Sequence, residues 1–306
     1  MEMINPTKMT KILNEANMFI IIPDIISHIL LNYLYEPEYK LDPWFYVSSR
    51  FIKINEFMLS TNCKAISFLK KYPQYISYDA FNDNKNKEIV PILLDNFEEI
   101  IWECLSSNPA GIPILLDNKH YIDWNTFSSN PSDEAVELLL SPSNVDKINW
   151  AFFSGNENTK AVEFLISSKQ NISNINWDAL SGNTNPIAIN FLKNYPHKIN
   201  WRELSGNTSD EAIDLLLSNT ANIDWEFFSG NSNKKAIEFI LKNQDEIDWD
   251  FFSSNEGEGV MDILKQNEDK INWSYISSNP NIFIKCEEAT LEKNKKIIDN
   301  LKNLRK

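Results

Sequence analysis

The sequence predicts an all-α fold, an α-solenoid built from helical-hairpin repeats of about 24 residues. The first observation is a nine-residue segment, Ile223–Asn231, that recurs along the chain. The second is the spacing of its tryptophans, which is 24 residues for the last four steps and 22, 26 and 27 for the earlier ones. The third is that apolar residues follow each segment at helical spacing. The tryptophans are Trp102, Trp124, Trp150, Trp177, Trp201, Trp225, Trp249 and Trp273.

The first helix of each repeat is predicted to begin at the tryptophan. In the copy Ile199–Asn207, Asn200 precedes Trp201. Asparagine is a good N-cap residue, because its side-chain oxygen can accept a hydrogen bond from a backbone N–H of the first turn. Gly206 is expected to end this helix, since glycine readily takes the left-handed conformation found at helix C-termini. The first helix is therefore short in every copy.

A longer second helix is predicted after the last asparagine of the segment. Asn207 is a candidate N-cap for it, and in three copies the next residue is proline, which the first position of a helix tolerates. Asp210 and Glu211 fall in the first turn, where the helix dipole favours negative charge. Ala212 and Leu216 then begin a helical pattern of apolar residues. Because two such short helices bury little surface, neighbouring repeats must stack on each other.

The repeated tryptophan and asparagine allow two interpretations. A row of tryptophans could stack bases or sugars, and a row of asparagines could line a groove. Both positions also meet a local need of the repeat, which is a large apolar side chain for the core and an N-cap for a helix. We therefore predict that Trp201 and its equivalents are buried between adjacent repeats, and that the asparagines are caps.

The repeats occupy the middle of the chain. We expect a single elongated array at residues 51–283, with a less regular first copy in which Glu56 stands at the tryptophan position. Residues 1–50 are predicted to form N-terminal helices, and residues 284–306 a charged C-terminal helix. Because the first and last repeats of a solenoid each expose one face, these flanking helices are expected to cap the array.

The chain is acidic, with a net charge of −14. Residues 101–280 contain 26 acidic and 12 basic residues, so this part of the array carries the whole net charge. An acidic surface repels phosphate backbones, which argues against nucleic-acid binding. A partner that binds the array by charge would be basic.

Cysteine usage and hydropathy indicate a reducing compartment and no membrane span. Cys63, Cys104 and Cys286 are far apart and lack the spacing of metal ligands. The apolar stretch at residues 18–34 is interrupted by Pro23 and by polar residues, so it lacks the length and purity of a spanning helix. We expect a cytoplasmic protein, with the nucleus as the alternative.

The N-terminal segment at residues 22–51 begins with an Ile-Pro pair, continues with apolar residues at four-residue spacing and ends in a Val-Ser-x-Arg-aromatic sequence. This pattern resembles the F-box, a short helical module that binds the Skp1 adaptor of SCF ubiquitin ligases. The segment departs from the F-box pattern at Ile25, where an acidic residue is common, and in the proline-containing stretch at residues 36–43. The resemblance implies a partner-binding set of Ile22, Pro23, Ile26, Leu30, Leu34, Val47 and Phe51.

Two functional hypotheses follow. In the first, the F-box-like head recruits a Skp1-type ubiquitin-ligase subunit while the solenoid binds an unknown target protein, which makes the chain a non-enzymatic adaptor. In the second, residues 1–50 only cap the array, and the protein is an interaction scaffold with no ubiquitin-ligase link. The sequence contains no nucleotide-binding loop and no paired-histidine zinc motif, so we expect no catalytic residue, metal or cofactor.

The array as a whole is similar to the tandem Trp-x-x-Leu/Phe-Ser-x-Asn repeat proteins of giant DNA viruses that infect amoebae. The abundance of Ile, Asn and Lys is typical of an AT-rich genome of that kind. This resemblance supports the repeat fold and implies the host cytosol as the location, and it carries no activity with it.

Overall fold

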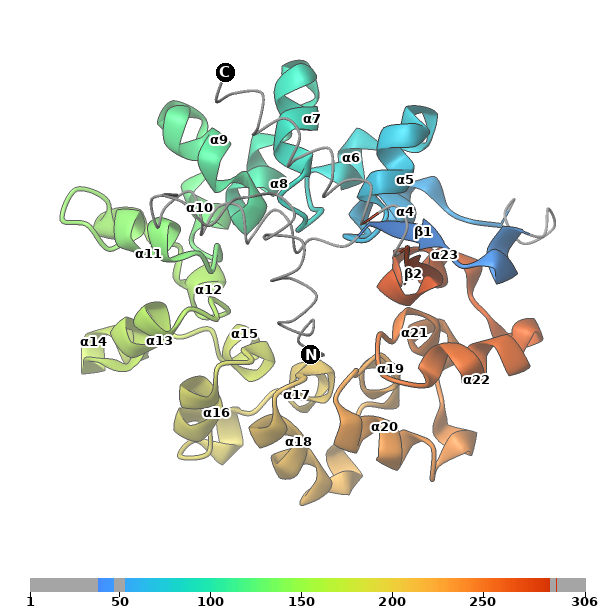
Figure 1. Ribbon diagram of the computed structural model, residues 1–306. Helices are drawn as coiled ribbons and strands as arrows, with labels where there is room; N and C mark the ends of the chain where they lie inside the picture. Colours follow the sequence, from blue (N-terminus) through green and yellow to red (C-terminus); the bar gives the residue numbers. More distant parts are fainter. Residues whose placement is uncertain (1–37, 47–52, 287–289, 291–306) are drawn as a thin grey trace, which may run out of the picture. The chain divides into compact units, whose positions relative to one another are not determined.

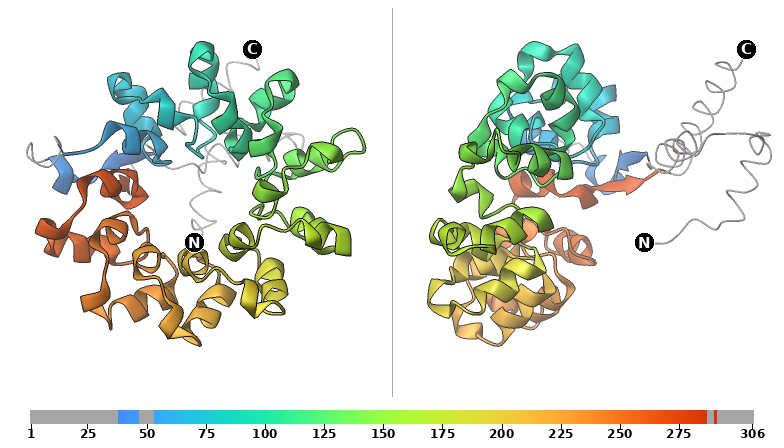
Figure 2. Two further views of the ribbon diagram at one scale, coloured as in Figure 1. Left: turned by 180° about the vertical axis from the view of Figure 1, so that it is seen from behind. Right: turned by 90° about the vertical axis from the view of Figure 1, so that its left-hand side faces the viewer.

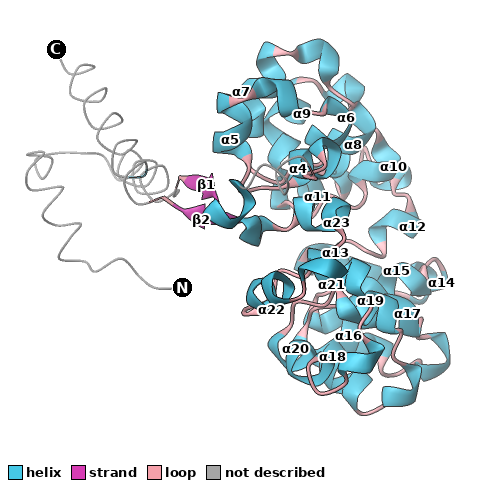
Figure 3. Cartoon of the chain, turned by 90° about the vertical axis from the view of Figure 1, so that its right-hand side faces the viewer, coloured by secondary structure: helices cyan, strands magenta, loops and turns pink. Residues whose placement is uncertain are grey.

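The computed structural model describes residues 38–46, 53–286 and 290. These residues are mostly helical, which confirms the all-α class. The chain divides into two units: residues 42–282, and residues 1–41 together with 283–306. Among the described residues, helices and loops make up the larger unit, and the two strands belong to the smaller one (Figure 3).

In the larger unit, short inner helices lie around a central axis, and outer helices surround them (Figure 1). Neighbouring inner helices such as α17 and α19 contact each other, and the last one, α23, contacts the first one, α4. The same closed arrangement is seen from behind (Figure 2). The inner helices are α4 (Glu56–Thr61), α6 (Tyr78–Phe81), α8 (Trp102–Ser107), α10 (Trp124–Phe127), α12 (Trp150–Phe153), α15 (Trp177–Gly182), α17 (Trp201–Gly206), α19 (Trp225–Ser229), α21 (Trp249–Ser254) and α23 (Trp273–Ser278).

An outer helix follows each of the first nine inner helices and completes the core of its repeat. In α18 (Asp210–Leu217), Ala212, Ile213 and Leu216 are buried, as their helical spacing predicts. The other outer helices are α5 (Ile66–Lys71), α7 (Ile89–Asp95), α9 (Ile112–Asp117), α11 (Asp133–Leu139), α13 (Thr159–Ile166) with the additional α14 (Lys169–Ser173), α16 (Pro186–Leu192), α20 (Lys234–Ile240) and α22 (Val260–Gln266).

Short 3-10 turns connect the helices. One of them precedes α9, and the others return the chain from an outer helix to the next inner one. They are η2 (Pro73–Tyr75), η3 (Phe97–Glu99), η4 (Pro109–Gly111), η5 (Lys119–Tyr121), η6 (Val145–Lys147), η7 (Pro196–Lys198), η8 (Thr220–Asn222), η9 (Gln244–Glu246) and η10 (Glu268–Lys270).

Capping residues decide where these helices begin. Asn200 accepts hydrogen bonds from two backbone N–H groups in the first turn of α17, as predicted. The outer helix α18 begins after Ser209, whose hydroxyl accepts a hydrogen bond from the backbone N–H of Ala212. The predicted role of Asn207 as the N-cap of this helix is therefore wrong. The left-handed glycine predicted at Gly206 is also wrong, because among the described glycines only Gly259 has a positive φ.

A buried asparagine at the end of each inner helix joins neighbouring repeats. The side-chain NH₂ of Asn207 donates hydrogen bonds to the carbonyl oxygens of Ser181 and Asn183 in the preceding repeat, at 3.0 and 2.9 Å. Its Oδ1 accepts a hydrogen bond from the backbone N–H of Ser209. The carboxamide is thus paired within the core, where an unpaired group would be destabilising. We call the equivalent residues ladder asparagines: Asn62, Asn84, Asn108, Asn130, Asn156, Asn183, Asn207, Asn231, Asn255 and Asn279.

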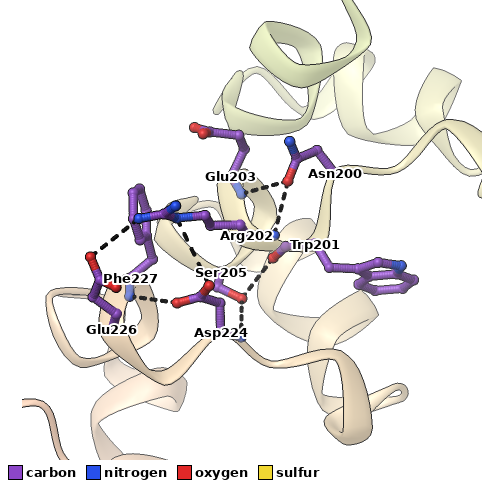
Figure 4. A network of polar contacts seen from close by, with 8 residues as sticks. All are labelled: Asn200, Trp201, Arg202, Glu203, Ser205, Asp224, Glu226 and Phe227. Carbon is purple, nitrogen blue, oxygen red and sulfur yellow. Dashed lines mark hydrogen bonds and ion pairs between the residues drawn. The ribbon is translucent and has the colours of Figure 1, made fainter.

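A residue two positions before each ladder asparagine forms a second bridge. The Ser205 hydroxyl donates a hydrogen bond to the carbonyl oxygen of Trp201 at 2.7 Å and accepts one from the backbone N–H of Asp224 in the next repeat at 3.0 Å (Figure 4). The second repeat has Asn82 at this place, and its amide makes the two corresponding contacts. Backbone groups of neighbouring repeats are therefore joined at two points.

The ladder continues across the two ends of the larger unit. Asn62 of the first repeat donates hydrogen bonds to the carbonyl oxygens of Ser277 and Asn279 in the tenth, at 3.3 and 3.0 Å. The Ser277 hydroxyl accepts a hydrogen bond from the backbone N–H of Asn55. These contacts repeat the interior ones, so the unit is a closed ring of ten repeats. The predicted elongated array is wrong, because the two end faces that would need caps cover each other.

The N-terminal end of the larger unit completes the tenth repeat. The inner helix α23 is followed by a 3-10 turn, η11 (Pro280–Ile282), and another turn, η1 (Pro43–Tyr46), stands in for the outer helix. Trp44 stacks on Trp273 with ring centroids 6.1 Å apart. In three other repeats an outer-helix phenylalanine stacks on the tryptophan at 6.1 to 6.4 Å. Both ends of the unit thus contribute to one repeat core.

Asp42 fixes the first residues of the unit to the last repeats. Its backbone N–H donates a hydrogen bond to the carbonyl oxygen of Ile282 at 2.8 Å. Its carboxylate accepts hydrogen bonds from Lys265 Nζ and from the backbone N–H of Trp44. Burial raises the pKa of Asp42, but these hydrogen bonds outweigh it and lower the pKa below its ordinary value. Because the folded-state pKa is lowered, the contact stabilises the ring at neutral pH and is lost as the pH falls through that pKa.

The tryptophans are half-buried, so the prediction that they are buried between repeats is wrong. Trp225 packs on Phe239 in the outer helix of its own repeat, with ring centroids 6.1 Å apart. The fully buried aromatic is Phe228, three residues later. The first residue of a helix lies at its end and cannot be surrounded on every side. In some repeats a lysine covers the open face, as Lys270 covers Trp249 at 4.4 Å.

The smaller unit contains a two-stranded antiparallel sheet that the sequence analysis did not anticipate. Strand β1 (Tyr39–Leu41) pairs with β2 (Phe283–Lys285), and Tyr39 lies opposite Lys285. The predicted C-terminal helix at residues 284–306 is thus replaced by strand at its beginning. Most of that helix and most of the predicted N-terminal helices at residues 1–50 lie outside the described residues.

Ring closure predicts that Asn62→Ala destabilises the protein as strongly as Asn207→Ala, by about 2–4 kcal/mol, because each change leaves two buried carbonyl groups of a neighbouring repeat without their donor. Denaturant unfolding followed by tryptophan fluorescence measures both losses. Asn222→Ala, at an exposed position, is the matched control and should change the free energy of unfolding by less than about 0.5 kcal/mol. In an open array Asn62 would lack these partners, so a nearly neutral Asn62→Ala would contradict closure.

The difference in burial predicts that Phe228→Ala is more destabilising than Trp225→Ala. We expect a loss of about 3–5 kcal/mol for the buried phenylalanine and a clearly smaller loss for the half-buried tryptophan. Urea unfolding of the two variants, followed by circular dichroism, gives the comparison. A larger loss for Trp225→Ala would show that the indole forms the core after all.

Candidate partner-binding surface

One side of each inner helix faces the centre of the ring. In α17, Leu204 and Ser205 are buried on the side that packs against the rest of the repeat and its neighbour. Because successive residues of an α-helix are turned by about 100°, Arg202 and Glu203 lie on the opposite side. Figure 4 shows Trp201 and Arg202 pointing in opposite directions. We call the two residues after the tryptophan position, and the residue before the ladder asparagine, the lumen positions.

One lumen position of every repeat is exposed to solvent. The residue directly after the tryptophan position is exposed in all ten repeats, which means that the centre of the ring is not filled by these side chains. The ten residues are Phe57, Asp79, Glu103, Asn125, Ala151, Asp178, Arg202, Glu226, Asp250 and Ser274.

The packing of ten helices side by side fixes the width of this lumen. With about 9 Å between neighbouring helix axes, the axes lie on a circle of roughly 14 Å radius. Subtracting a helix radius of about 5–6 Å with side chains leaves an opening of roughly 18 Å. One α-helix with its side chains is about 10–12 Å wide, and a small domain is about 30 Å across. The lumen is therefore wide enough for one helix and too narrow for a folded domain.

Negative charge dominates the lumen positions. Seven of these 30 residues are acidic and one, Arg202, is basic, so the lumen attracts cations. The Arg202 guanidinium lies 3.2 Å from a Glu226 oxygen and 3.9 Å from an Asp224 oxygen, so its charge is already compensated within the wall (Figure 4). The acidic residues are Asp79, Asp83, Glu103, Asp178, Glu203, Glu226 and Asp250.

Aromatic side chains interrupt the acidic lumen. Phe57 is 50% exposed and Phe152 is 44% exposed, which is unusual for phenylalanine in a folded chain. Phe227, Phe251 and Tyr275 form a row across three repeats, with successive ring centroids 5.5 Å apart. Such a surface offers apolar contacts and cation–π contacts next to carboxylates.

The cysteines of the larger unit are poor candidates for nucleophiles. Burial raises the pKa of Cys63, and the nearby carboxylate of Glu256 raises it further. Burial also raises the pKa of Cys104, and the charge of Asp83 adds to this effect. Both thiols are therefore protonated at neutral pH, and the thiolate is the reactive form.

The predicted partner-binding residues and the lumen are different parts of the chain. All seven residues of the predicted set lie outside the described residues: Ile22, Pro23, Ile26, Leu30, Leu34, Val47 and Phe51. The lumen surface was not predicted from the sequence. Its signal is the residue after each tryptophan position, which ranges from phenylalanine through aspartate to arginine while the residues around it repeat.

A scan against known protein families, a search of curated proteins and a search of solved structures each returned no match to this chain. In the part of the chain that the structure describes, no helix is both long and apolar enough to cross a membrane. Within the same residues, no three His, Cys, Asp or Glu side chains form a group that could hold a metal ion.

The exposure of the lumen acids predicts that they do not stabilise the ring. The triple variant Asp79→Asn, Glu103→Gln, Asp250→Asn should have a free energy of unfolding within about 1 kcal/mol of that of the wild type, because the lost repulsion between like charges offsets the loss of negative charge from the first turns of three helices. Thermal unfolding at low and at high salt measures this, and the difference should shrink at high salt. A marked loss of stability would assign these carboxylates a structural role.

Proposed function

We propose that the protein is a non-enzymatic, protein-binding adaptor whose ring holds a target protein. The observation that carries this proposal is the lumen surface, in which the residue after the tryptophan position is exposed in all ten repeats and acidic and aromatic side chains recur. Large repeated surfaces of this kind suit the binding of polypeptides. The excess of carboxylates favours a basic target and disfavours nucleic acid.

The second part of the proposal is that residues 22–51 recruit a Skp1-type ubiquitin-ligase subunit. Its support is the F-box resemblance of the sequence, with Pro23, Leu30 and Leu34 in the partner-binding set. An F-box leaves such apolar residues available to a partner. In this proposal the head binds the ligase and the ring presents the target, in the cytosol or the nucleus.

An interaction scaffold without a ubiquitin-ligase link is the second candidate. Its support is Trp44, which lies within residues 1–50 and stacks on Trp273 in the tenth repeat, so part of this segment serves the ring itself. The two candidates share the target-binding ring and differ only in the head.

Co-purification separates these candidates. We expect the full-length protein to retain a Skp1-type protein, and the double variant Pro23→Ser, Leu30→Asp to lose it, because a polar or charged side chain would enter an apolar interface. Circular dichroism of the variant should match the wild type, since the ring at residues 42–282 is untouched. The control is the double variant Lys8→Ser, Lys11→Asp, which lies outside the partner-binding set and should retain the Skp1-type protein. Absence of the Skp1-type protein from the wild-type sample would rule against the ubiquitin-ligase adaptor and favour the scaffold without that link.

A further inference from the structure

We propose that the lumen binds one lysine- or arginine-rich amphipathic α-helix of a partner protein, which enters the ring by a free end. This inference deepens the proposed function by naming the class of target segment. The faces of ten inner helices are its binding surface, and charge complementarity identifies the occupant. The lumen positions hold seven acidic residues, and their one basic residue, Arg202, is already paired.

The width of the lumen selects a helix among the possible basic segments. An occupant about 10–12 Å wide inside an opening of roughly 18 Å leaves about 3–4 Å on every side. Extended lysine and arginine side chains reach beyond this average width, so they can span the gap to carboxylates around the wall. An extended chain is thinner and would reach only one part of the wall at a time, whereas a folded domain does not enter.

The distribution of lumen residues indicates that the occupant is amphipathic. Acidic residues gather in two arcs, with Asp79 and Glu103 in the second and third repeats, and Asp178, Glu226 and Asp250 in the sixth to ninth. Between the arcs lie repeats without a lumen acid. These carry Phe152 in the fifth repeat, Tyr275 in the tenth and Phe57 in the first.

In a closed ring of ten repeats, the fifth and the tenth stand opposite each other. The lumen therefore presents aromatic side chains at two opposed places, Phe152 in the fifth repeat and a row from the eighth to the tenth repeat. Within this row, Phe227 and Phe251 share their repeats with lumen carboxylates. A helix with apolar residues flanked by lysine or arginine matches this order. Contacts between its apolar residues and the phenylalanines would add to the charge attraction.

Closure of the ring imposes a condition on entry. Asn62 continues the ladder between the first and tenth repeats, so the wall has no gap at that seam. A segment must consequently thread through the lumen, and it can do so only if one of its ends is free of any domain wider than the opening. Binding to the outside of the ring carries no such condition.

The first experiment measures the affinity of the full-length protein for fluorescent 20-residue peptides by anisotropy. The probe is an amidated helix of lysine and leucine, and its counterparts replace leucine by alanine or lysine by glutamate. We expect binding of the Lys/Leu peptide that weakens with salt, weaker binding of the Lys/Ala peptide and no binding of the Glu/Leu peptide.

The location of the site is tested with variants of equal charge. Asp79→Asn, Glu103→Gln, Asp250→Asn in the lumen should weaken binding of the Lys/Leu peptide roughly tenfold, as expected for the loss of three exposed charge pairs. The matched control is Glu134→Gln, Glu163→Gln, Glu238→Gln on exposed positions of outer helices, which makes the same change in net charge. It should change the affinity by less than about twofold, since it lies outside the lumen. Equal weakening by both triples would place the peptide elsewhere.

The mode of entry is tested by fusing small folded proteins to the Lys/Leu peptide. A fusion at one end should bind like the free peptide, whereas fusions at both ends should bind at least tenfold more weakly. Proteolytic removal of one fused protein should restore binding. Equal binding of the single and double fusions would overturn threading. If the Lys/Leu peptide fails to bind while an endogenous target still co-purifies with the ring, this inference falls and the proposed function stands.

Discussion

The larger unit depends on how a single asparagine side chain is shared between repeats. A ladder asparagine such as Asn207 lies at the end of an inner helix, pairs its Oδ1 with its own repeat and gives both amide hydrogens to carbonyl groups of the preceding one. Those carbonyls lie at the C-terminus of a helix, where the last C=O groups have no N–H partner within the helix. One carboxamide thus pairs the free carbonyl groups at the end of one helix and holds two repeats together. Aspartate has the same shape but lacks the donors.

This constraint explains why the tryptophan position and the ladder asparagine are the same distance apart in sequence in every repeat. The bridging serine lies four residues after the tryptophan position and the ladder asparagine two residues further, so one added residue would turn both side chains by about 100° away from the preceding repeat. Outer helices have such a bridge only in some repeats, as where Asn233 donates to the carbonyl oxygen of Thr208 in the preceding repeat, and they vary more. The fifth repeat carries the additional α14 (Lys169–Ser173), and η1 replaces the helix in the tenth.

Much of this local structure could be predicted from the sequence. The periodicity identified the repeats, and Asn200 and the apolar spacing of α18 behave as local rules require. The errors came from residues with two possible roles. Asn207 is suited to a helix N-cap, and Ser209 competes for that place while the carboxamide reaches a backbone 24 residues away. Trp201 is large and apolar, yet its place at a helix end leaves one face open.

Ring closure was beyond what the sequence could predict. The angle between two stacked repeats is the result of many small differences in packing between the inner and outer layers, and no residue type encodes it. Closure requires that ten such angles add up to a full circle. The lumen followed from closure, because the residues after the tryptophans form a surface only when ten inner helices surround one axis. The F-box-like segment is independent of these arguments and rests on its own sequence pattern.

The closed ladder also restricts how such a protein can change in evolution. An open solenoid gains or loses a repeat at little expense to the others, because each unit contacts only its neighbours. In this ring, each pair of neighbouring repeats turns the chain by about a tenth of a circle. Duplication of one repeat would require every one of these angles to change, or it would break the contact between Asn62 and Asn279. Repeat number is therefore a collective property of the ring.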